Sequence, residues 1–472
     1  MGRVVLVVLL WSGLVWSHWT PELAWDGTMR DRVVRELRRS VAASPRVLQP
    51  ERHLARVLGV AEKVILVVEG RIFVSAKHRN LNKHKPQYHL KFLQSILESS
   101  SMPNFAYVFE EEAKGASDDG DLPFVAIAKW KGYEQPGVLV PNPYFANVTT
   151  WGREMRRLER PSWDDRDPRC LWRGAIITKE CKQDTGNHAR FCAVVRSVEH
   201  PSLIDARPVG RFEPRNPSLD PPRDRYCSRM AYDATMREIA TSARNASAFL
   251  VPFMASSNFS RYQYLLNLPG VMGGSYSRNL NLLWNAGSVV LLWDARHVEW
   301  YYAALRHNVT HVGVGCDTLV EQMRNLRADP ALALALRKNA KRVYDAFLAP
   351  EALVWYMQHL ARALRDHSQM GLVLDDRDTR HAFFRSINCS RLFLLEVRIS
   401  EEAASPQIDD YDLRTIDPAD PAMGPCAQEE EDDDDRGGGE GLAAKLHSAL
   451  GGVLRKSGKQ PWTLLRHPHY YR

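Results

Sequence analysis

The sequence lacks several short motifs that identify common classes of protein. Its 472 residues contain neither G-x-G-x-x-G nor G-x-x-x-x-G-K-[ST], which excludes the usual fingerprints of dinucleotide-binding folds and P-loop nucleotidases. No two cysteines have the C-x-x-C spacing of a zinc site or a thioredoxin-like redox site. There is no internal repeat and no nucleic-acid recognition module. We therefore expect no metal, no cofactor and no nucleic-acid partner.

Long apolar runs are also scarce. The run from Val4 to Val15 follows Arg3 and precedes Ser17, which is the pattern of a secretory signal peptide cleaved near residue 17. It is shorter than the roughly 20 residues that a spanning helix needs, and the alternative is an uncleaved signal anchor. Both interpretations place the rest of the chain in the lumen of the endoplasmic reticulum or Golgi, or outside the cell. We expect no membrane span after signal cleavage.

Cysteines and glycosylation sequons agree with a luminal protein. In an oxidising compartment most of the seven cysteines are expected in disulfides, with one left over. The cysteines are Cys170, Cys181, Cys192, Cys227, Cys316, Cys389 and Cys426, and N-x-S/T sequons begin at Asn147, Asn245, Asn258, Asn308 and Asn388.

The charge of the chain is unevenly distributed. The net charge is +7, although the run Glu429–Asp435 alone contributes seven negative charges. The remainder is therefore strongly basic and suited to phosphates, sugar nucleotides or acidic polymers, among which charge alone does not choose.

The hydrophobic pattern predicts strands that alternate with helices. Toward the N-terminus it indicates helical segments within 29–59 and 88–97, a tight hairpin over 64–74, and strands at 104–110 and 124–130. From Cys170 onward the alternation becomes regular, which favours a parallel sheet covered by helices. The elements expected there are strands at 171–177, 262–268, 288–293 and 309–314, and helices at 189–198, 230–244, 278–286, 298–306, 317–327, 330–348 and 350–366.

The stretch "GGSYSRNLNLLWNAGSVVLLW", residues 273–293, follows one of these strands. Ser275 or Ser277 can cap the next helix, and Gly287 suits the position after its last turn. A helix N-terminus favours anions, whereas Arg278 in the first turn opposes the helix dipole unless it faces an anion. The stretch is either a diphosphate-binding turn or an ordinary connection between two core elements.

Two further segments carry candidate ligand-binding residues. "LWRGA" places Arg173 on a strand, and Arg190 follows in the next helix, from which it could reach a phosphate; the alternative is that both arginines form ordinary ion pairs. In "EWYYAALRHNVTHVGVGCDTL", Glu299 could accept hydrogen bonds from ribose hydroxyls, or could simply be an acid at a helix start.

An acidic loop at residues 110–121 follows the strand "NFAYVFE". Glycosyl transfer to a hydroxyl needs a carboxylate that takes the proton of the acceptor, and the end of a strand would present one. The alternative is a solvated surface loop.

These segments, in this order, resemble glycosyltransferase family 90, the Rumi-like protein O-glucosyltransferases and capsule-associated xylosyltransferases, over about residues 90–366. The resemblance is strongest in "LWRGA", in "YLLNLPGV" with the following "SYSRNLNLLWNAGSVVL", and in the segment that begins "EWYY". It implies an α/β protein of GT-B type, in which two Rossmann-like lobes face a central cleft. We therefore expect a signal peptide over 1–17, an N-terminal lobe with the acceptor and base loop over 18–165, a C-terminal UDP-sugar-binding lobe over 166–370, and a largely disordered extension over 371–472 that includes the acidic tract 429–435.

The resemblance also assigns roles to residues. It implies that Arg190 and Arg278 hold the diphosphate, although the register leaves Asn279 as the alternative to Arg278. The family serine after R-G is Ala175 here, so that its hydrogen bond is missing or is made by the backbone. The family base corresponds to Ala113 by strict spacing, and a shift of one or two residues gives Glu112 or Glu111. The expected UDP-sugar-binding residues are Arg173, Ala175, Arg190, Ser275, Ser277, Arg278, Ser288 and Glu299.

The function implied is inverting transfer of glucose or xylose from a UDP-sugar to a hydroxyl of a protein or polysaccharide. The alternative is a catalytically inactive luminal protein that binds UDP or glycans on the same scaffold, which the alanines at positions 113 and 175 favour.

Overall fold

The computed structural model describes residues 28–44, 50–60, 64–75, 84–110, 124–130, 137–145, 147–175, 186–209, 251–270, 280–295, 297–386, 392–397 and 411–415. The chain divides into two compact units, Met1–Ala427 and Gln428–Arg472, and every described residue belongs to the first. Within the described ranges no helix is both long and apolar enough to cross a membrane.

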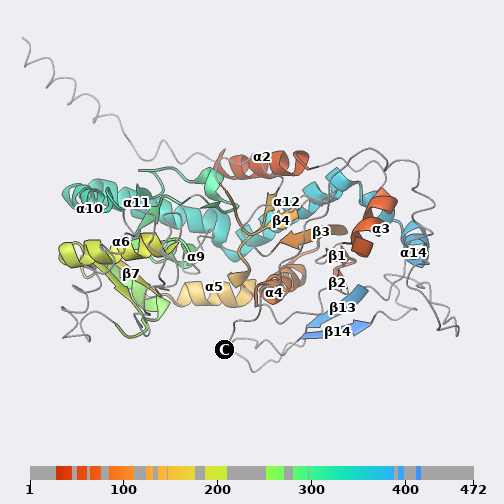
Figure 1. Cartoon of the computed structure of the whole chain (residues 1–472), viewed down its shortest axis with the longest axis horizontal. Helices are drawn as coiled ribbons and strands as arrows, with labels where there is room; N and C mark the ends of the chain where they lie inside the picture. The colour runs from red at the N-terminus through yellow and green to blue at the C-terminus, as the bar shows by residue number, and fades with distance from the viewer. Residues whose placement is uncertain are drawn as a thin grey trace, which may run out of the picture. The chain divides into compact units, whose positions relative to one another are not determined.

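A mixed seven-stranded sheet contains the early strands (Figure 1). The predicted hairpin is confirmed: β1 and β2 pair antiparallel with Val68 opposite Arg71, and the turn between them places Glu69 and Gly70 at positive φ. The sheet has the order β14-β13-β2-β1-β3-β4-β6, with β1 (Val64–Val68), β2 (Arg71–Ser75), β3 (Phe105–Glu110), β4 (Phe124–Ala126), β6 (Val138–Leu139), β13 (Leu392–Val397) and β14 (Tyr411–Thr415).

Amphipathic helices cover this sheet. In α2, Met29, Val33, Leu37 and Val41 recur every four residues and are all buried, as one face of a helix requires. The other helices of this part are α3 (Pro50–Val60), α4 (His84–Ser99) and α5 (Val148–Arg157), and α2 spans Thr28–Ala42.

The chain after residue 370 differs from the expected extension. Helices α13 (Gly371–Leu374) and α14 (Arg377–Ser386) follow directly, and β13 then pairs antiparallel with β2 through Leu392 and Ser75. The boundary at 370 therefore does not end the folded unit, because two strands that come late in the sequence complete the early sheet. The acidic tract 429–435 lies outside the described residues.

The second sheet has five strands that all pair in parallel, in the order β12-β10-β9-β7-β8. This confirms the parallel sheet that the alternating pattern predicts. Parallel strands are buried on both faces, and β10 accordingly consists only of buried residues. The strands are β7 (Asp167–Gly174), β8 (Ile204–Pro208), β9 (Tyr262–Asn267), β10 (Val289–Trp293) and β12 (Val312–Val314).

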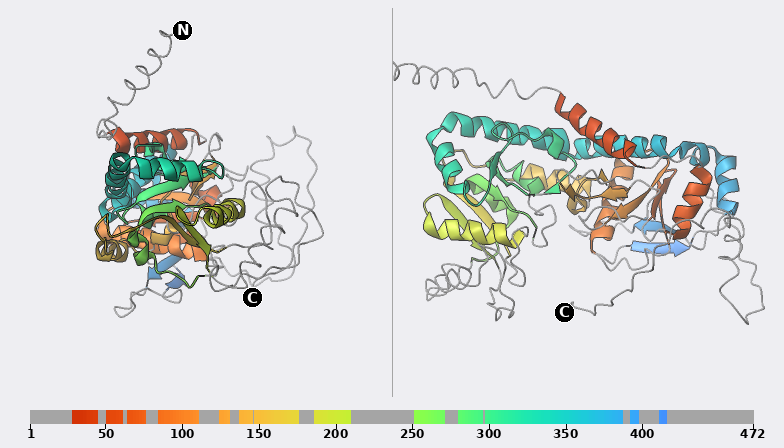
Figure 2. Two further views of the ribbon diagram at one scale, coloured as in Figure 1. Left: turned by 90° about the vertical axis from the view of Figure 1, so that its left-hand side faces the viewer. Right: turned by 45° about the horizontal axis from the view of Figure 1, so that its top comes forward.

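Helices cover both faces of the parallel sheet (Figure 2). One face packs against α6, α10 and α11 through a cluster that includes Trp172 and Leu291. Leu265 and Val290 belong instead to the largest apolar cluster, which reaches α12 and the first sheet. The helices are α6 (Gly186–Glu199), α9 (Leu280–Leu283), α10 (Leu319–Ala328), α11 (Pro330–Val343) and α12 (Pro350–Ser368), and α12 contacts α2, α4, α5 and β3.

Two predicted helices are shorter or absent. Among the described residues of this segment, 280–286, only α9 is helical; turns follow it, and Gly287 has a φ of 72°. The predicted helix at 298–306 is wrong. Its first residue, Val298, belongs to β11 (His297–Val298), which pairs with β5 (Lys129–Trp130), and a short 3-10 turn follows at Tyr302–Ala304. The apolar residues of this segment recur at the spacing of a helix face, but in the structure they pack against several different elements.

The turn at Gly287 is held by Arg166, whose side chain is buried. Its Nη1 donates to Ala286 O at 3.1 Å, to Gly287 O at 2.6 Å and to Ser288 Oγ at 3.1 Å. A Cβ added at Gly287 would lie 3.0 Å from Arg166 Nη2, whereas one added at Gly70, which has a similar φ of 74°, would meet nothing within 4 Å.

We expect Gly287→Ala to destabilise the protein by about 2 kcal/mol or more. An alanine in the left-handed backbone conformation costs about 1–2 kcal/mol, and the side chain of Arg166 must also move. Gly70→Ala carries only the backbone cost and is the matched control. Chemical denaturation of both variants measures the difference. Equal losses of stability would show that Arg166 does not constrain this turn.

Candidate functional site

A cavity of about 800 Å³ lies at the carboxyl ends of β10 and β12. Trp293 and Asp294 line it at the end of β10, and Val314 and Gly315 line it at the end of β12. Ligands of open α/β sheets bind at this edge, because the strands end there and backbone groups become available. The position and size of the cavity make it the candidate ligand site.

Glu299 lines this cavity and is the most unusual side chain in it. It is 2% exposed, and neither carboxyl oxygen has a hydrogen-bond partner among the described residues. Burial raises the pKa of Glu299 to about 8. A buried polar group without a partner costs about 1–3 kcal/mol, and more if it is charged, so that a ligand able to donate two hydrogen bonds would remove a penalty that the protein otherwise carries.

The aromatic residues after Glu299 fix its backbone. The ring of Trp300 packs 4.2 Å from that of Tyr356 on α12 and 5.9 Å from that of Phe347. The hydroxyl of Tyr301 accepts a hydrogen bond from Trp284 Nε1 at 3.0 Å. Trp300 also lines the cavity, and its buried Nε1 has no acceptor within the described part of the chain.

A charged pair from the first part of the chain forms another wall of the cavity. Lys129 Nζ lies 3.0 Å from Glu36 Oε1 and 3.1 Å from Ser40 Oγ. Lys129 belongs to β5, and His297 of β11 pairs with its neighbour Trp130, so that the two-stranded ribbon brings this pair to the cavity. Leu139 of β6 also lines the cavity, so that both sheets contribute residues to one site.

Arg190 lies at the same edge of the parallel sheet, beyond the ends of β7 and β9. Its Nη1 donates to Ala175 O at 2.6 Å, and its Nε and Nη2 donate to Pro269 O at 3.1 and 3.0 Å. Burial lowers the pKa of Arg190 to about 10, and no charged group among the described residues contributes to this shift. A buried cation whose hydrogen bonds to described residues all go to carbonyl oxygens is suited to an anionic ligand. Ala175 thus contributes to this arrangement through its backbone.

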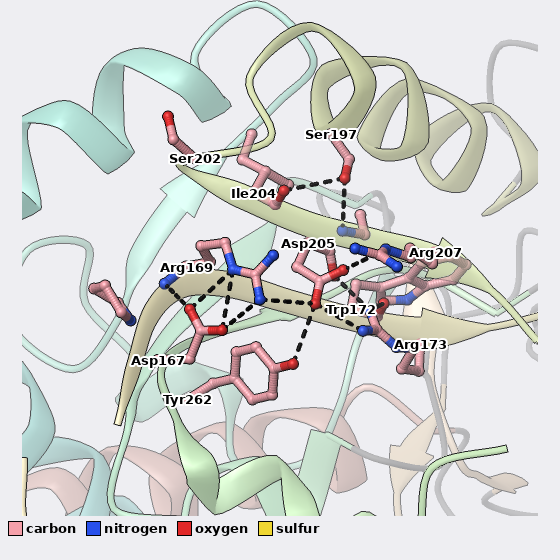
Figure 3. A network of polar contacts seen from close by, with 12 residues as sticks. Asp167, Arg169, Trp172, Arg173, Ser197, Ser202, Ile204, Asp205, Arg207 and Tyr262 are labelled. Atoms are coloured by element: carbon pink, nitrogen blue, oxygen red, sulfur yellow. Dashed lines mark hydrogen bonds and ion pairs between the residues drawn. The ribbon is translucent and has the colours of Figure 1, made fainter. Parts of the chain in front are cut away.

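Arg173, in contrast, forms part of an internal ionic network (Figure 3). Its Nη2 lies 2.8 Å from Asp205 Oδ2, while Arg207, Arg169 and Tyr262 contact the same carboxylate. Burial opposes the ionisation of Asp205, but the hydrogen bond from Arg173 and the surrounding arginines hold its pKa below the ordinary value. Arg173 therefore forms an ordinary ion pair, the second of the two interpretations of the sequence. Its positive charge is neutralised by Asp205.

Ser288 does not lie with Arg190. It precedes β10, and its hydroxyl donates to Tyr262 O at 2.7 Å, at the first residue of β9. This is the amino edge of the parallel sheet, opposite to the edge that carries the cavity. The other predicted residues, namely Glu111, Glu112, Ser275, Ser277 and Arg278, lie outside the described residues.

A disulfide links Cys192 on α6 to Cys316, which confirms for this pair the expectation from the cysteine content. Cys316 lies between Gly315 and Thr318, which both line the cavity. The bond thus ties the helix that carries Arg190 to the loop beyond β12. Cys170 is buried and is a free cysteine.

Sequence reasoning missed several residues of the cavity, including Glu36, Lys129, His307 and His311. The first two are far from the motifs in the sequence and reach the site only through tertiary contacts. The two histidines lie within a quoted motif, and their spacing across a short turn was a usable signal. No group of three or more metal-ligating side chains is placed to hold an ion within the described ranges.

No protein-family model matches the chain, and no curated protein matches it. A similar solved structure is the crystal structure of the pneumococcal O-GlcNAc transferase GtfA in complex with UDP and GlcNAc, with 15% identity and a TM-score of 0.29. The match covers 50% of this chain and 41% of that chain, so that it spans less than half the length of the transferase. A likeness of this size carries no argument about function.

Glu299→Gln should alter how stability depends on pH. The folded protein keeps the proton of Glu299 up to a pKa of about 8, whereas the unfolded chain loses it near the ordinary value of 4.5. Between these values the folded state binds more protons, so that the wild type loses about 1.4 kcal/mol of unfolding free energy per pH unit through this group as pH rises.

Urea denaturation between pH 5 and 8 measures this effect. Glu299→Gln should lack the loss and be more stable than the wild type at pH 8. Glu98→Gln, on the exposed surface of α4, is the matched control and should follow the wild type. Parallel pH profiles for the wild type and Glu299→Gln would contradict the buried, protonated state of Glu299.

Proposed function

We propose that this protein is a UDP-sugar-dependent glycosyltransferase whose donor binds at the carboxyl edge of the parallel sheet. The observation that carries the proposal is the buried carboxyl group of Glu299, which lines the cavity with neither oxygen hydrogen-bonded. The 2′ and 3′ hydroxyls of a ribose are two adjacent donors that match two adjacent acceptor oxygens. As these hydrogen bonds form, they favour the ionised carboxylate and offset the cost of its burial.

Arg190 supplies a positive charge for the diphosphate. As the bond between the sugar and UDP breaks, negative charge develops on the leaving UDP, and a cation already in position lowers the barrier without reorganising. The carbonyl groups of Ala175 and Pro269 fix the guanidinium between the ends of two strands. In the proposal Arg278 adds a second positive charge, and Ser275 and Ser277 add donors at the start of the following helix.

The proposed transfer is inverting and needs no metal. Glu112 or Glu111 takes the proton of the acceptor hydroxyl, whose oxygen attacks the anomeric carbon from the side opposite to UDP. The sugar is glucose or xylose, and the acceptor is a hydroxyl of a protein or polysaccharide in the endoplasmic reticulum or Golgi. The two sheets correspond in this proposal to the two lobes of a GT-B fold, with Lys129 and Glu36 on the acceptor side.

The experiment is a panel of UDP-sugars, with the release of UDP measured with and without hydroxyl acceptors. Turnover of UDP-glucose or UDP-xylose supports the proposal. UDP binding without turnover of any sugar would support instead an inactive UDP- or glycan-binding protein. Failure to bind UDP at millimolar concentration would contradict both the transferase and an inactive UDP-binding protein.

Arg190→Gln should lower the rate of UDP release by about 100-fold or more, the usual effect of losing one group that stabilises developing charge. Arg324→Gln, on the exposed face of α10, is the matched control and should retain full activity. Thermal unfolding of both variants checks that they are folded. An Arg190→Gln variant that is folded and fully active would remove Arg190 from the donor site.

A further inference from the structure

We infer that His307 and His311 together recognise a ligand edge that presents one hydrogen-bond acceptor beside one donor. Under the function proposed above, on which this inference rests, that edge is the O4 and N3–H edge of uracil. Both histidines line the cavity. The hydrogen bonds around each ring set which of its nitrogens carries the proton.

The backbone fixes the tautomer of His307. The N–H of Gly313 donates to His307 Nδ1 at 2.9 Å, so that Nδ1 is the acceptor nitrogen of a neutral ring. A neutral imidazole carries its single proton on the other nitrogen. His307 Nε2–H is therefore a donor, and no acceptor contacts it among the described residues. His307 is an exposed residue, so that a ligand in the cavity can reach this donor.

Thr310 fixes the tautomer of His311. The hydroxyl of Thr310 donates its only proton to Arg306 O at 3.0 Å and lies 3.0 Å from His311 Nδ1. Because the hydroxyl proton is already used, the hydrogen bond between Thr310 and His311 takes its proton from the ring. His311 Nδ1–H therefore donates to Thr310 Oγ1. His311 Nε2 is then an acceptor. Burial lowers the pKa of His311 to about 4 and keeps this ring neutral at physiological pH.

A short, well-connected turn holds His307 and His311 next to each other along the backbone. The backbones of His307 and His311 form a bridge, and Asn308 N donates to His311 O at 2.8 Å. Thr310 N donates to Arg306 O at 2.9 Å, and Asn308 adopts a left-handed φ of 58°. The pair thus offers one fixed donor and one fixed acceptor at the wall of the cavity, with little freedom to exchange these roles.

This pattern distinguishes among nucleobases. Uracil presents the acceptor O4 next to the donor N3–H, which His307 Nε2–H and His311 Nε2 complement. Cytosine presents the donor N4–H next to the acceptor N3, so that its pattern is reversed and both contacts become repulsive. A site whose groups are fixed rejects a ligand that leaves them unpaired more strongly than its size alone would suggest.

The test measures the binding of UDP and CDP to the full-length protein by calorimetry. We expect the wild type to bind UDP about 100-fold more tightly than CDP, from two mismatched hydrogen bonds. In His307→Asn the amide oxygen can still accept from Gly313 N–H, but the donor at the position of Nε2 is lost. In His311→Gln the amide can rotate to offer either a donor or an acceptor. Both variants should reduce the preference for UDP to less than about tenfold.

His359→Asn on α12 is the matched control, because this histidine contacts Trp355 outside the cavity lining. It should keep the preference of the wild type, and unchanged thermal unfolding of the variants checks their fold. An unchanged UDP preference in both His307→Asn and His311→Gln, or equal binding of UDP and CDP by the wild type, would overturn this inference alone. Absence of UDP binding by the wild type would instead overturn the proposed function.

Discussion

The burial of an unpaired carboxyl group is the constraint that the candidate site has to satisfy. The carboxyl oxygens of Glu299 are buried, and no described residue hydrogen-bonds to them. A protein tolerates such a group only where the surrounding structure is rigid enough to keep it in place. The aromatic packing of Trp300 against Tyr356 and Phe347 supplies that rigidity, at the expense of stability at higher pH.

Several long-range connections converge on the same cavity. The β5–β11 ribbon joins the segment that carries Lys129 to the loop that carries Glu299. The Cys192–Cys316 disulfide joins α6 to the loop that lines the cavity beyond β12. These links come from segments more than 100 residues apart in the sequence, and they make the shape of the site depend on the folding of both sheets.

The sequence predicts the parallel sheet well, because buried parallel strands form continuous apolar runs that are separated by helical segments. It places Arg190 in the helix that follows the strand of "LWRGA", as the structure has it, and it places Glu299 at a helix start that the structure replaces with β11. The ligand-binding roles of both residues stay predictions. The sequence does not predict β13, since the pairing of this strand with β2 depends on contacts more than 300 residues apart. The helix expected at 298–306 fails for a related reason: the aromatic residues there pack against several elements and not along one helix face.

The roles of Arg173 and Ser288 also depend on tertiary structure. Arg173 has the local pattern of a ligand-binding residue, but Asp205 on the neighbouring strand neutralises it. Ser288 lies close in sequence to the predicted diphosphate turn, yet it lies at the amino edge of the sheet because the chain reverses between β9 and β10. Only the position of each residue in the three-dimensional structure distinguishes Arg173 and Ser288 from Arg190, which lies beyond the carboxyl ends of β7 and β9.

The most direct measurement of the central claim, that Glu299 binds the ribose, compares the affinities of UDP, 2′-deoxy-UDP and 3′-deoxy-UDP for the wild type and for Glu299→Gln. Removing either hydroxyl should weaken binding to the wild type about tenfold, the value of one hydrogen bond to a charged group. The same removals should change binding to Glu299→Gln less than about twofold. Equal losses in both proteins would show that the hydroxyls do not contact Glu299 and would contradict the account.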